Sequence, residues 1–155
     1  MKLTTKGRYA VTAMLDLAIN YEEDSVTLRQ IAEKQKISLS YLEQLFAKLR
    51  KNNLVKGVRG PGGGYTLARN VNEISIAEII SAVDEPMNFT DCNDRADCKD
   101  GEQCLSHHLW VQLSDQIEGF LSGIYLGALM KDCISNGAEH NSMKELSQKV
   151  SLPSH

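Results

Sequence analysis

Apolar side chains recur at steps of three and four along residues 6–21 of this chain. Ala10, Met14, Leu17 and Ala18 fall on one face when the segment is wound as a helix, with further apolar residues beside them. The pattern predicts an amphipathic helix whose apolar face packs against a core.

Two short helices are predicted next, each with a polar pattern at its start. Thr27 and Gln30 match a capping box, in which two side chains bond the free backbone amides of the first turn. The following helix begins at Ser38 or Ser40 and runs to about residue 52, with Ser40 and Glu43 as a second capping box. Two short helices joined by a tight turn predict a helix-turn-helix.

A hairpin is predicted directly after these helices. Two short apolar runs, 54–58 and 65–67, flank a glycine-rich segment that begins at Arg59. A hairpin after a helix-turn-helix is a wing, and Arg59 suits the narrow minor groove of DNA, where the potential is most negative. The alternative is a plain surface hairpin with a solvated arginine. A P-loop is excluded, because no lysine follows Gly62-Gly63.

The predicted recognition helix carries polar side chains that suit DNA. Residues near its start are expected to face base edges, and Lys or Arg near its end to meet phosphates. Gln44 can form two hydrogen bonds to adenine, whereas Glu43 either accepts from a cytosine amino group or only caps the helix. The predicted DNA-binding residues are Ser38, Ser40, Tyr41, Glu43, Gln44, Lys48, Arg50, Lys51, Arg59 and Gly60.

Downstream of the hairpin, two more helices are predicted with a long loop between them. Ser75 and Glu78 form a third capping box, which starts a helix to about residue 83. Residues 86–104 show no period, and a loop of this length calls for a function. The next helix has an apolar stripe wider than one small domain needs, which predicts dimerisation; alternatively, it covers its own winged domain. The stripe comprises Leu105, Leu109, Leu113, Ile117, Phe120, Leu121 and Ile124.

Charge is divided unevenly along the chain. Residues 1–69 hold 12 Lys and Arg against 6 Asp and Glu, a net of +6, whereas residues 70–155 hold 5 against 14, a net of −9. The basic half favours a polyanion partner for that part, although basic halves also occur in ordinary domains. Neither a membrane-length apolar run nor a secretory signal is visible, so we expect a cytoplasmic protein with no membrane partner.

Three of the four cysteines gather with a histidine in one short segment. Cys92, Cys98, Cys104 and His107 follow the spacing C-x5-C-x5-C-x2-H, and thiolate and imidazole are ligands of zinc and of iron–sulfur clusters. In a reducing compartment this group indicates a metal site rather than disulfides. The residues alone favour a cluster and a structural zinc equally. His108 is a rival ligand that would complete a C-x5-C-x3-H pattern typical of RNA-binding zinc fingers, but the segment lacks their base-stacking aromatics.

Three segments and the ligand spacing resemble the bacterial iron–sulfur cluster regulators. The segments are 3–10 (LTTKGRYA), 37–49 (ISLSYLEQLFAKL) and 58–65 (VRGPGGGY), and the likeness covers about residues 1–130. The resemblance implies a homodimeric winged-helix transcription factor that reads DNA with the helix from Ser40 and with Arg59. It also implies a [2Fe-2S] cluster on Cys92, Cys98, Cys104 and His107.

In that family the cluster reports cellular supply and represses the operon for cluster assembly, and the apo form binds a second operator class. The implied partners are a double-stranded DNA operator, a second copy and iron–sulfur cluster donor proteins. A histidine ligand can be detached by protonation, which suits sensing better than storage. The alternatives are a winged-helix regulator with a structural zinc and a nitric-oxide-responsive cluster regulator. An enzyme or electron carrier is not expected, because no catalytic constellation is visible and the winged helix would be unexplained.

The predicted fold is mainly α-helical with a small β-hairpin. Residues 1–85 form a winged helix-turn-helix domain, and residues 86–104 form the cluster-binding loop. Residues 105–133 form the dimerisation helix and a following short helix. Residues 134–155 are polar and aperiodic, which predicts a disordered tail.

Overall fold

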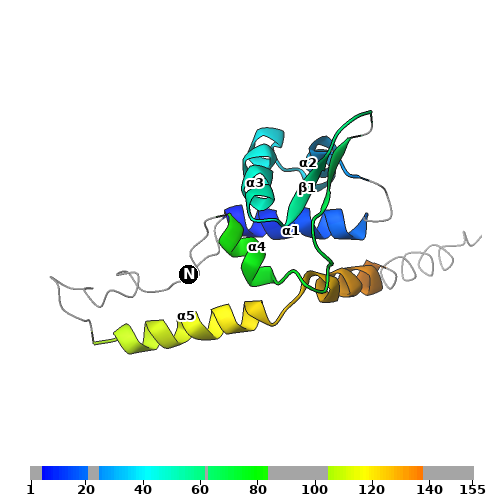
Figure 1. Cartoon of the computed structure of the whole chain (residues 1–155). Coiled ribbons are helices and arrows are strands. Elements are labelled where there is room, and N and C mark those ends of the chain that lie inside the picture. The colour runs from blue at the N-terminus through cyan, green and yellow to red at the C-terminus, as the bar shows by residue number, and fades with distance from the viewer. Residues whose placement is uncertain (1–4, 21–24, 62, 84–104, 138–155) are drawn as a thin grey trace, which may run out of the picture.

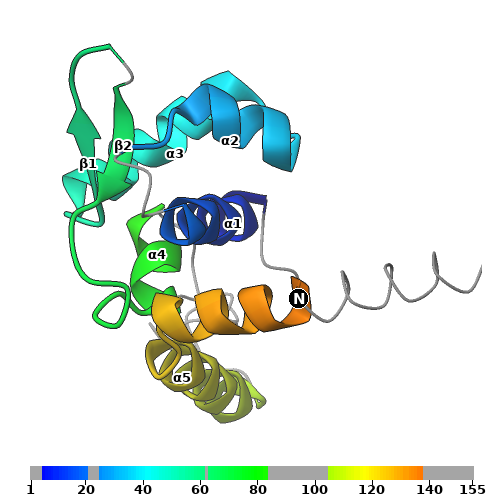
Figure 2. The same cartoon turned by 90° about the vertical axis from the view of Figure 1, so that its right-hand side faces the viewer.

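Helix α1 (Thr5–Ile19) is the central element of the fold. The computed structural model describes residues 5–20, 25–61, 63–83 and 105–137. Helices α2 (Leu28–Gln35) and α3 (Leu39–Lys51) lie on one side of α1, whereas α4 (Ile76–Ala82) and a helix over residues 126–137 lie on the other (Figures 1 and 2). The two strands are β1 (Val55–Val58) and β2 (Gly64–Leu67), and helix α5 is His107–Ser122.

The apolar face predicted for α1 is confirmed as the base of the core. Ala10, Met14, Leu17 and Ala18 are each at most 2% exposed. The largest side chain with no exposed area is Phe46 of α3, which packs in the same cluster. Burial of this shared apolar surface is the main force that holds α3 on α1.

The helix-turn-helix is confirmed, with one correction at the start of α3. Thr27 and Gln30 form the predicted capping box, because the Thr27 hydroxyl accepts from the Gln30 amide and the Gln30 side chain accepts from the Thr27 amide. The capping box predicted at Ser40 and Glu43 is wrong. Helix α3 already begins at Leu39, so Ser40 lies inside its first turn, and the Ser40 hydroxyl instead pairs with the Ser38 hydroxyl at 3.0 Å.

The hairpin pairs antiparallel and is extended by one residue from outside it. Val55 faces Leu67, and Val58 faces Gly64. Val26, which precedes α2, bridges to Tyr65: the Val26 amide donates to the Tyr65 carbonyl at 3.0 Å, and the reverse bond is 2.8 Å. This bridge fixes the wing to the start of the helix-turn-helix (Figure 2).

The junction after α5 is held against the start of α4. The Ile76 amide donates to the Ile124 carbonyl at 2.9 Å, and the Leu126 amide donates to the Ile74 carbonyl at 2.8 Å. From this junction α5, which precedes it in the chain, extends past α4 and away from the other helices (Figure 1). Only two residues of α5, His107 and Ser114, are buried. No helix among the described residues is long and apolar enough to cross a membrane.

The remaining predicted segments are only partly described. The predicted capping box of Ser75 and Glu78 is confirmed at the start of α4. The last helix continues to residue 137, past the predicted start of the tail at 134. The loop predicted to bind a cluster, 86–104, and residues 138–155 lie outside the described residues.

Candidate DNA interface and cluster ligands

Helix α3 presents a polar stripe on the face opposite its apolar one. Its buried residues are Leu42, Leu45, Phe46 and Leu49, none more than 3% exposed. A spacing of three and four places the exposed side chains together on the other face. These residues are Ser40, Glu43, Gln44, Ala47, Arg50 and Lys51, and Leu39 at the start of the helix is also exposed.

Ala47 was not among the predicted DNA-binding residues. It is exposed and lies one turn after Glu43, in the middle of the stripe. A methyl side chain there allows the helix to approach a groove closely, and it can contact a thymine methyl group. The sequence signal was its spacing, which was overlooked because alanine carries no polar group.

Two predicted DNA-binding residues of α3 are only half exposed. Tyr41 packs against the core and meets Tyr9 of α1 edge to face, with ring centroids 5.8 Å apart and planes at 83°. Lys48 is also half-buried. The packed ring of Tyr41 therefore fixes the first turn of α3, whereas Ser38 before it is exposed.

The wing adds exposed basic side chains beside α3. Arg59 and Gly60 are exposed at the tip, and the φ of +111° at Gly60 is one that glycine adopts without strain. Lys56 on β1 is also exposed, although it was not among the predicted DNA-binding residues. Val55 is the only buried residue of β1, so the side chain of Lys56 next to it faces solvent.

The surface formed by α3 and the wing is basic. Residues 39–67 hold five basic side chains, at 48, 50, 51, 56 and 59, and one acidic side chain, Glu43, a net of +4. Three of the basic residues lie in the last turn of α3, where they also interact favourably with the helix dipole. Such a surface attracts a polyanion, and a lone carboxylate within it repels phosphate.

Behind the wing, an ion pair supports the start of α4. Arg69 donates to the Glu78 carboxylate at 2.9 Å and to the Glu73 carbonyl at 2.7 Å. The Ser75 backbone amide and then the Arg69 guanidinium hold the pKa of Glu78 below its usual value of 4.5. Glu78, the acidic partner of Ser75 in the capping box, is therefore ionised and paired with Arg69 at neutral pH.

Of the four predicted cluster ligands, one lies within the described residues. His107 is the first residue of α5 and is 6% exposed, whereas His108 beside it is exposed. Their ring centroids are 6.1 Å apart. Cys92, Cys98 and Cys104 lie outside the described residues, and within the described ranges no group of three or more His, Cys, Asp or Glu is close enough to hold a metal.

The apolar stripe predicted for dimerisation divides into three groups by burial. Leu105, Leu109 and Phe120 are exposed, at 107%, 57% and 69%. Leu113 and Ile117 are half-buried. Leu121 and Ile124 instead pack against the core of their own chain. The exposed apolar side chains of the stripe therefore lie along α5 and just before it, from Leu105 to Phe120.

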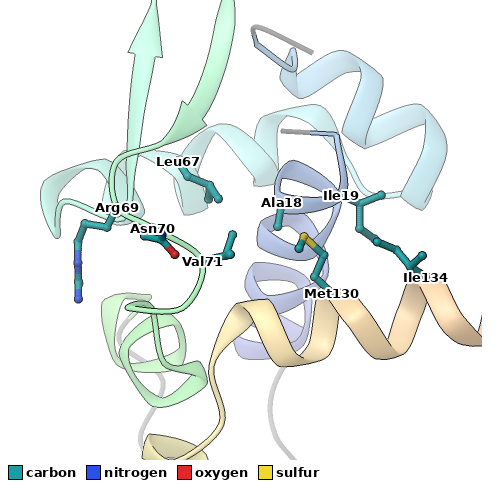
Figure 3. A pocket seen from close by; sticks show the side chains of 8 residues that line it. All are labelled: Ala18, Ile19, Leu67, Arg69, Asn70, Val71, Met130 and Ile134. Carbon is teal, nitrogen blue, oxygen red and sulfur yellow. The ribbon is translucent and has the colours of Figure 1, made fainter. Parts of the chain in front are cut away.

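A small cavity lies between the end of α1, the end of β2 and the last helix. Its volume is about 240 Å³, and Figure 3 shows Ile19, Met130 and Ile134 along one side of it. Its other described lining residues are Ala18, Leu67, Arg69, Asn70 and Val71. Most of this lining is apolar, and Arg69 is already bonded to Glu78 and Glu73. The described lining carries no acid–base or nucleophilic group suited to catalysis.

Known proteins resemble this chain over most of its length. The family model Rrf2, described as an iron-dependent transcriptional regulator, matches residues 3–132. The HTH-type transcriptional regulator IscR of Cronobacter sakazakii is 56% identical over 132 residues, which cover 85% of this chain and 82% of that protein. The IscR protein of Escherichia coli O1:K1 matches with the same identity and coverage.

Solved structures agree with these relatives. The structure of T. potens IscR superposes with a TM-score of 0.70 at 39% identity, covering 86% of this chain and 88% of that one. CymR, the global cysteine regulator of B. subtilis, gives a TM-score of 0.71 at 32% identity, covering 84% and 97%. These relatives are regulators rather than enzymes, and they confirm the predicted winged-helix fold and DNA-binding regulatory class. The chain belongs to the Rrf2 family of transcriptional regulators.

Proposed function

We propose that this chain is a cytoplasmic, homodimeric DNA-binding regulator that senses the supply of [2Fe-2S] clusters and controls the genes for cluster assembly. The observation that carries the proposal is a conjunction within one chain. An exposed polar stripe on α3, in a helix-turn-helix, is joined to the spacing C-x5-C-x5-C-x2-H, whose histidine is buried at the start of α5. Relatives named IscR support the same role.

The proposed DNA contacts divide by position on α3 and the wing. Ser40, Glu43 and Gln44 lie in the first turns and would face base edges, whereas Arg50 and Lys51 would meet phosphates. Each neutralised phosphate contributes about 0.9 to the salt slope of binding. Affinity is therefore expected to fall steeply with salt, and specificity to depend on the first turns of α3.

The proposed dimer forms through the exposed part of α5. Leu109 and Phe120 lie three turns apart on a helix that projects from the body, and both are more than half exposed. A two-fold axis through this helix would bury the same stripe on both copies, as an isologous interface requires. Two recognition helices would then face successive half-sites of one operator.

The donor set fits a [2Fe-2S] cluster. Cys92, Cys98 and Cys104 would supply three thiolates, and His107 would supply a neutral imidazole. The site would therefore carry one negative charge less than a site with a fourth thiolate. When bound, the cluster supplies a redox-active iron centre that persists only while iron and sulfide are available. The burial of His107 supports it over His108 as the fourth ligand. Cluster donor proteins would load the site.

The experiment that tests the proposal measures cluster content and operator affinity on the same preparations. The wild-type protein, His107→Ala and the matched control His108→Ala are reconstituted anaerobically with iron and sulfide. We expect a red-brown wild type and control, and loss of the cluster in His107→Ala. Operator affinity, measured by fluorescence anisotropy, is expected to differ between the holo and apo forms at one class of operator at least.

Two results would contradict the proposal. A colourless protein that retains zinc after reconstitution would identify a structural zinc site. Equal affinities of the holo and apo forms at every operator would show that the cluster does not switch DNA binding, because a ligand shifts an equilibrium only by binding two states unequally.

A further inference from the structure

Helix α2 is the least buried element of the helix-turn-helix. Ile31 is its only fully buried residue. Its start is nevertheless fixed, because Val26 is bonded to Tyr65 of the wing and Thr27 caps the first turn. With so little apolar burial, the position of its last turn depends on what holds that end.

A buried carboxylate holds the last turn of α2. Asp16 of α1 is 3% exposed. Its Oδ2 accepts a hydrogen bond from Gln35 Nε2 at 2.8 Å, and its Oδ1 accepts from Lys34 Nζ at 3.2 Å. Asn20, which follows the end of α1, donates to the same Oδ1 at 2.6 Å. Both carboxylate oxygens are therefore occupied, and two of the three donors belong to the end of α2.

These bonds to a buried carboxylate contribute less net stability than an apolar contact at the same place would. Burying a carboxylate carries a desolvation penalty that its bonds only partly offset, and apolar groups of similar volume are often as stabilising. Hydrogen bonds, however, are directional and lose strength within a few tenths of an ångström. The bonds from Lys34 and Gln35 to Asp16 therefore determine where the end of α2 lies more than how stable the domain is.

The end of α2 is coupled to the start of the recognition helix by a very short connection. Lys36 adopts the left-handed conformation with φ of 55°, and Ile37, which is buried, donates from its amide to the Ala32 carbonyl at 3.1 Å. Ser38 then caps α3. A tight turn with both ends anchored transmits a displacement of Gln35 to Ser38 and to the first turn of α3.

We propose that Asp16 is a positioning residue for operator reading, acting through Gln35 and Lys34 on the first turn of α3. The proposal rests on the proposed DNA interface. It implies that breaking the bonds between Asp16 and the end of α2 reduces discrimination between operator and other DNA. Base contacts are lost when their side chains are displaced, whereas phosphate contacts tolerate the shift.

The test compares operator and non-specific duplex affinities for four full-length proteins. They are the wild type, Asp16→Asn, Gln35→Ala and the matched control Asn20→Ala, which removes a bond to Asp16 without touching α2. Fluorescence anisotropy is measured at a temperature where circular dichroism shows each protein folded. The measured quantity is the ratio of the two affinities, because Asp16→Asn also changes the net charge. Gln35→Ala changes no charge and carries the test if Asp16→Asn does not fold.

We expect the ratio to fall roughly tenfold in Asp16→Asn and Gln35→Ala, the loss of about one base contact, and to change less than twofold in Asn20→Ala. The salt slope of non-specific binding is expected to be unchanged in Gln35→Ala. An unchanged ratio in folded Gln35→Ala, beside a discriminating wild type, would overturn the positioning role and leave the DNA interface intact. A wild type that does not discriminate would overturn the DNA-reading proposal and the positioning role with it.

Discussion

Gly64, the first residue of β2, is predicted to be essential for the wing. A Cβ at this position would overlap the carbonyl group of Val26 and approach the amide of Thr27. All of these are backbone atoms, so they cannot turn aside as a flexible side chain would. The substitution Gly64→Ala is therefore expected to force β2 away from the segment that leads into α2.

The size of the effect follows from the bonds at risk. The two hydrogen bonds between Val26 and Tyr65, at 3.0 and 2.8 Å, both depend on this close approach. Each contributes about 1 kcal/mol net, so their loss costs about 2 kcal/mol. For a chain of this size that corresponds to a Tm lowered by roughly 4–8 °C. Gly57 on β1 is the matched control, because a Cβ there meets nothing within 4 Å.

Urea and thermal denaturation followed by circular dichroism measure both variants against the wild type. Gly57→Ala is expected to be neutral or stabilised by about 0.5–1 kcal/mol, since alanine loses less chain entropy than glycine in a strand. Operator affinity is expected to fall in Gly64→Ala, because the wing moves relative to α3. If Gly64→Ala is as stable as Gly57→Ala, the close approach to Val26 does not constrain the wing, and the reasoning is refuted.

Three further predictions concern the caps and the projecting helix. Thr27→Ala is expected to lower the free energy of unfolding by about 1 kcal/mol, because the first turn of α2 loses its cap, and Thr27→Ser is expected to restore it. Glu78→Gln is expected to reduce stability at pH 7 by less than about 1 kcal/mol, since the pair with Arg69 is partly exposed. The lowered pKa of Glu78 means that its contribution is fully present above the usual value of 4.5 and is lost as pH falls through the lowered pKa; urea unfolding of both proteins across that range should converge at the acid end. Phe120→Asp is expected to give a monomer in analytical ultracentrifugation and to weaken operator binding at least tenfold, because two linked half-site contacts become independent.

Each of these predictions has its own contrary outcome. Equal stabilities of the alanine and serine variants at Thr27 would show that the hydroxyl does not cap α2. A constant stability difference between wild type and Glu78→Gln at every pH would exclude the ionised pair as its cause. For the dimer, Ser122→Asp provides a control, since Ser122 is an exposed polar residue of the same helix. Monomers in both variants would show that any charge on α5 is disruptive, and dimers in both would place the interface elsewhere.

The sequence pattern predicted the starts of two helices correctly, because a hydroxyl residue before a helix usually has one role, which is to cap it. The capping boxes at Thr27 and Ser75 form as predicted, because a hydroxyl at an N-cap has few competing partners. The pattern at Ser40 and Glu43 looked the same but is not a capping box. There the preceding turn, tightened by the left-handed Lys36, lets α3 begin one residue before Ser40, which removes Ser40 from the cap position.

Contacts between distant segments were not predictable from the pattern. Asp16 falls among apolar residues of α1, and nothing in its spacing indicates that Gln35 would bond it across 19 residues. The bridge from Val26 to Tyr65 likewise depends on the relative placement of α2 and the wing. At the end of α5, Leu121 and Ile124 continue the apolar stripe of Phe120, but both pack on the core of their own chain, where α5 ends at Gly123.

The bonded junction at Ile124 has a consequence for the spacing of DNA sites. Because the backbone there is bonded on both sides to Ile74 and Ile76, the projecting helix cannot swivel freely at its root. A change in the length of α5 would then pass undiminished to the separation of the two heads in a dimer. One inserted turn adds about 5.4 Å, more than one base-pair rise of about 3.4 Å and less than two. In the proposed dimer, the length of α5, from His107 to Ser122, would therefore set the spacing of the DNA half-sites that the two subunits can contact.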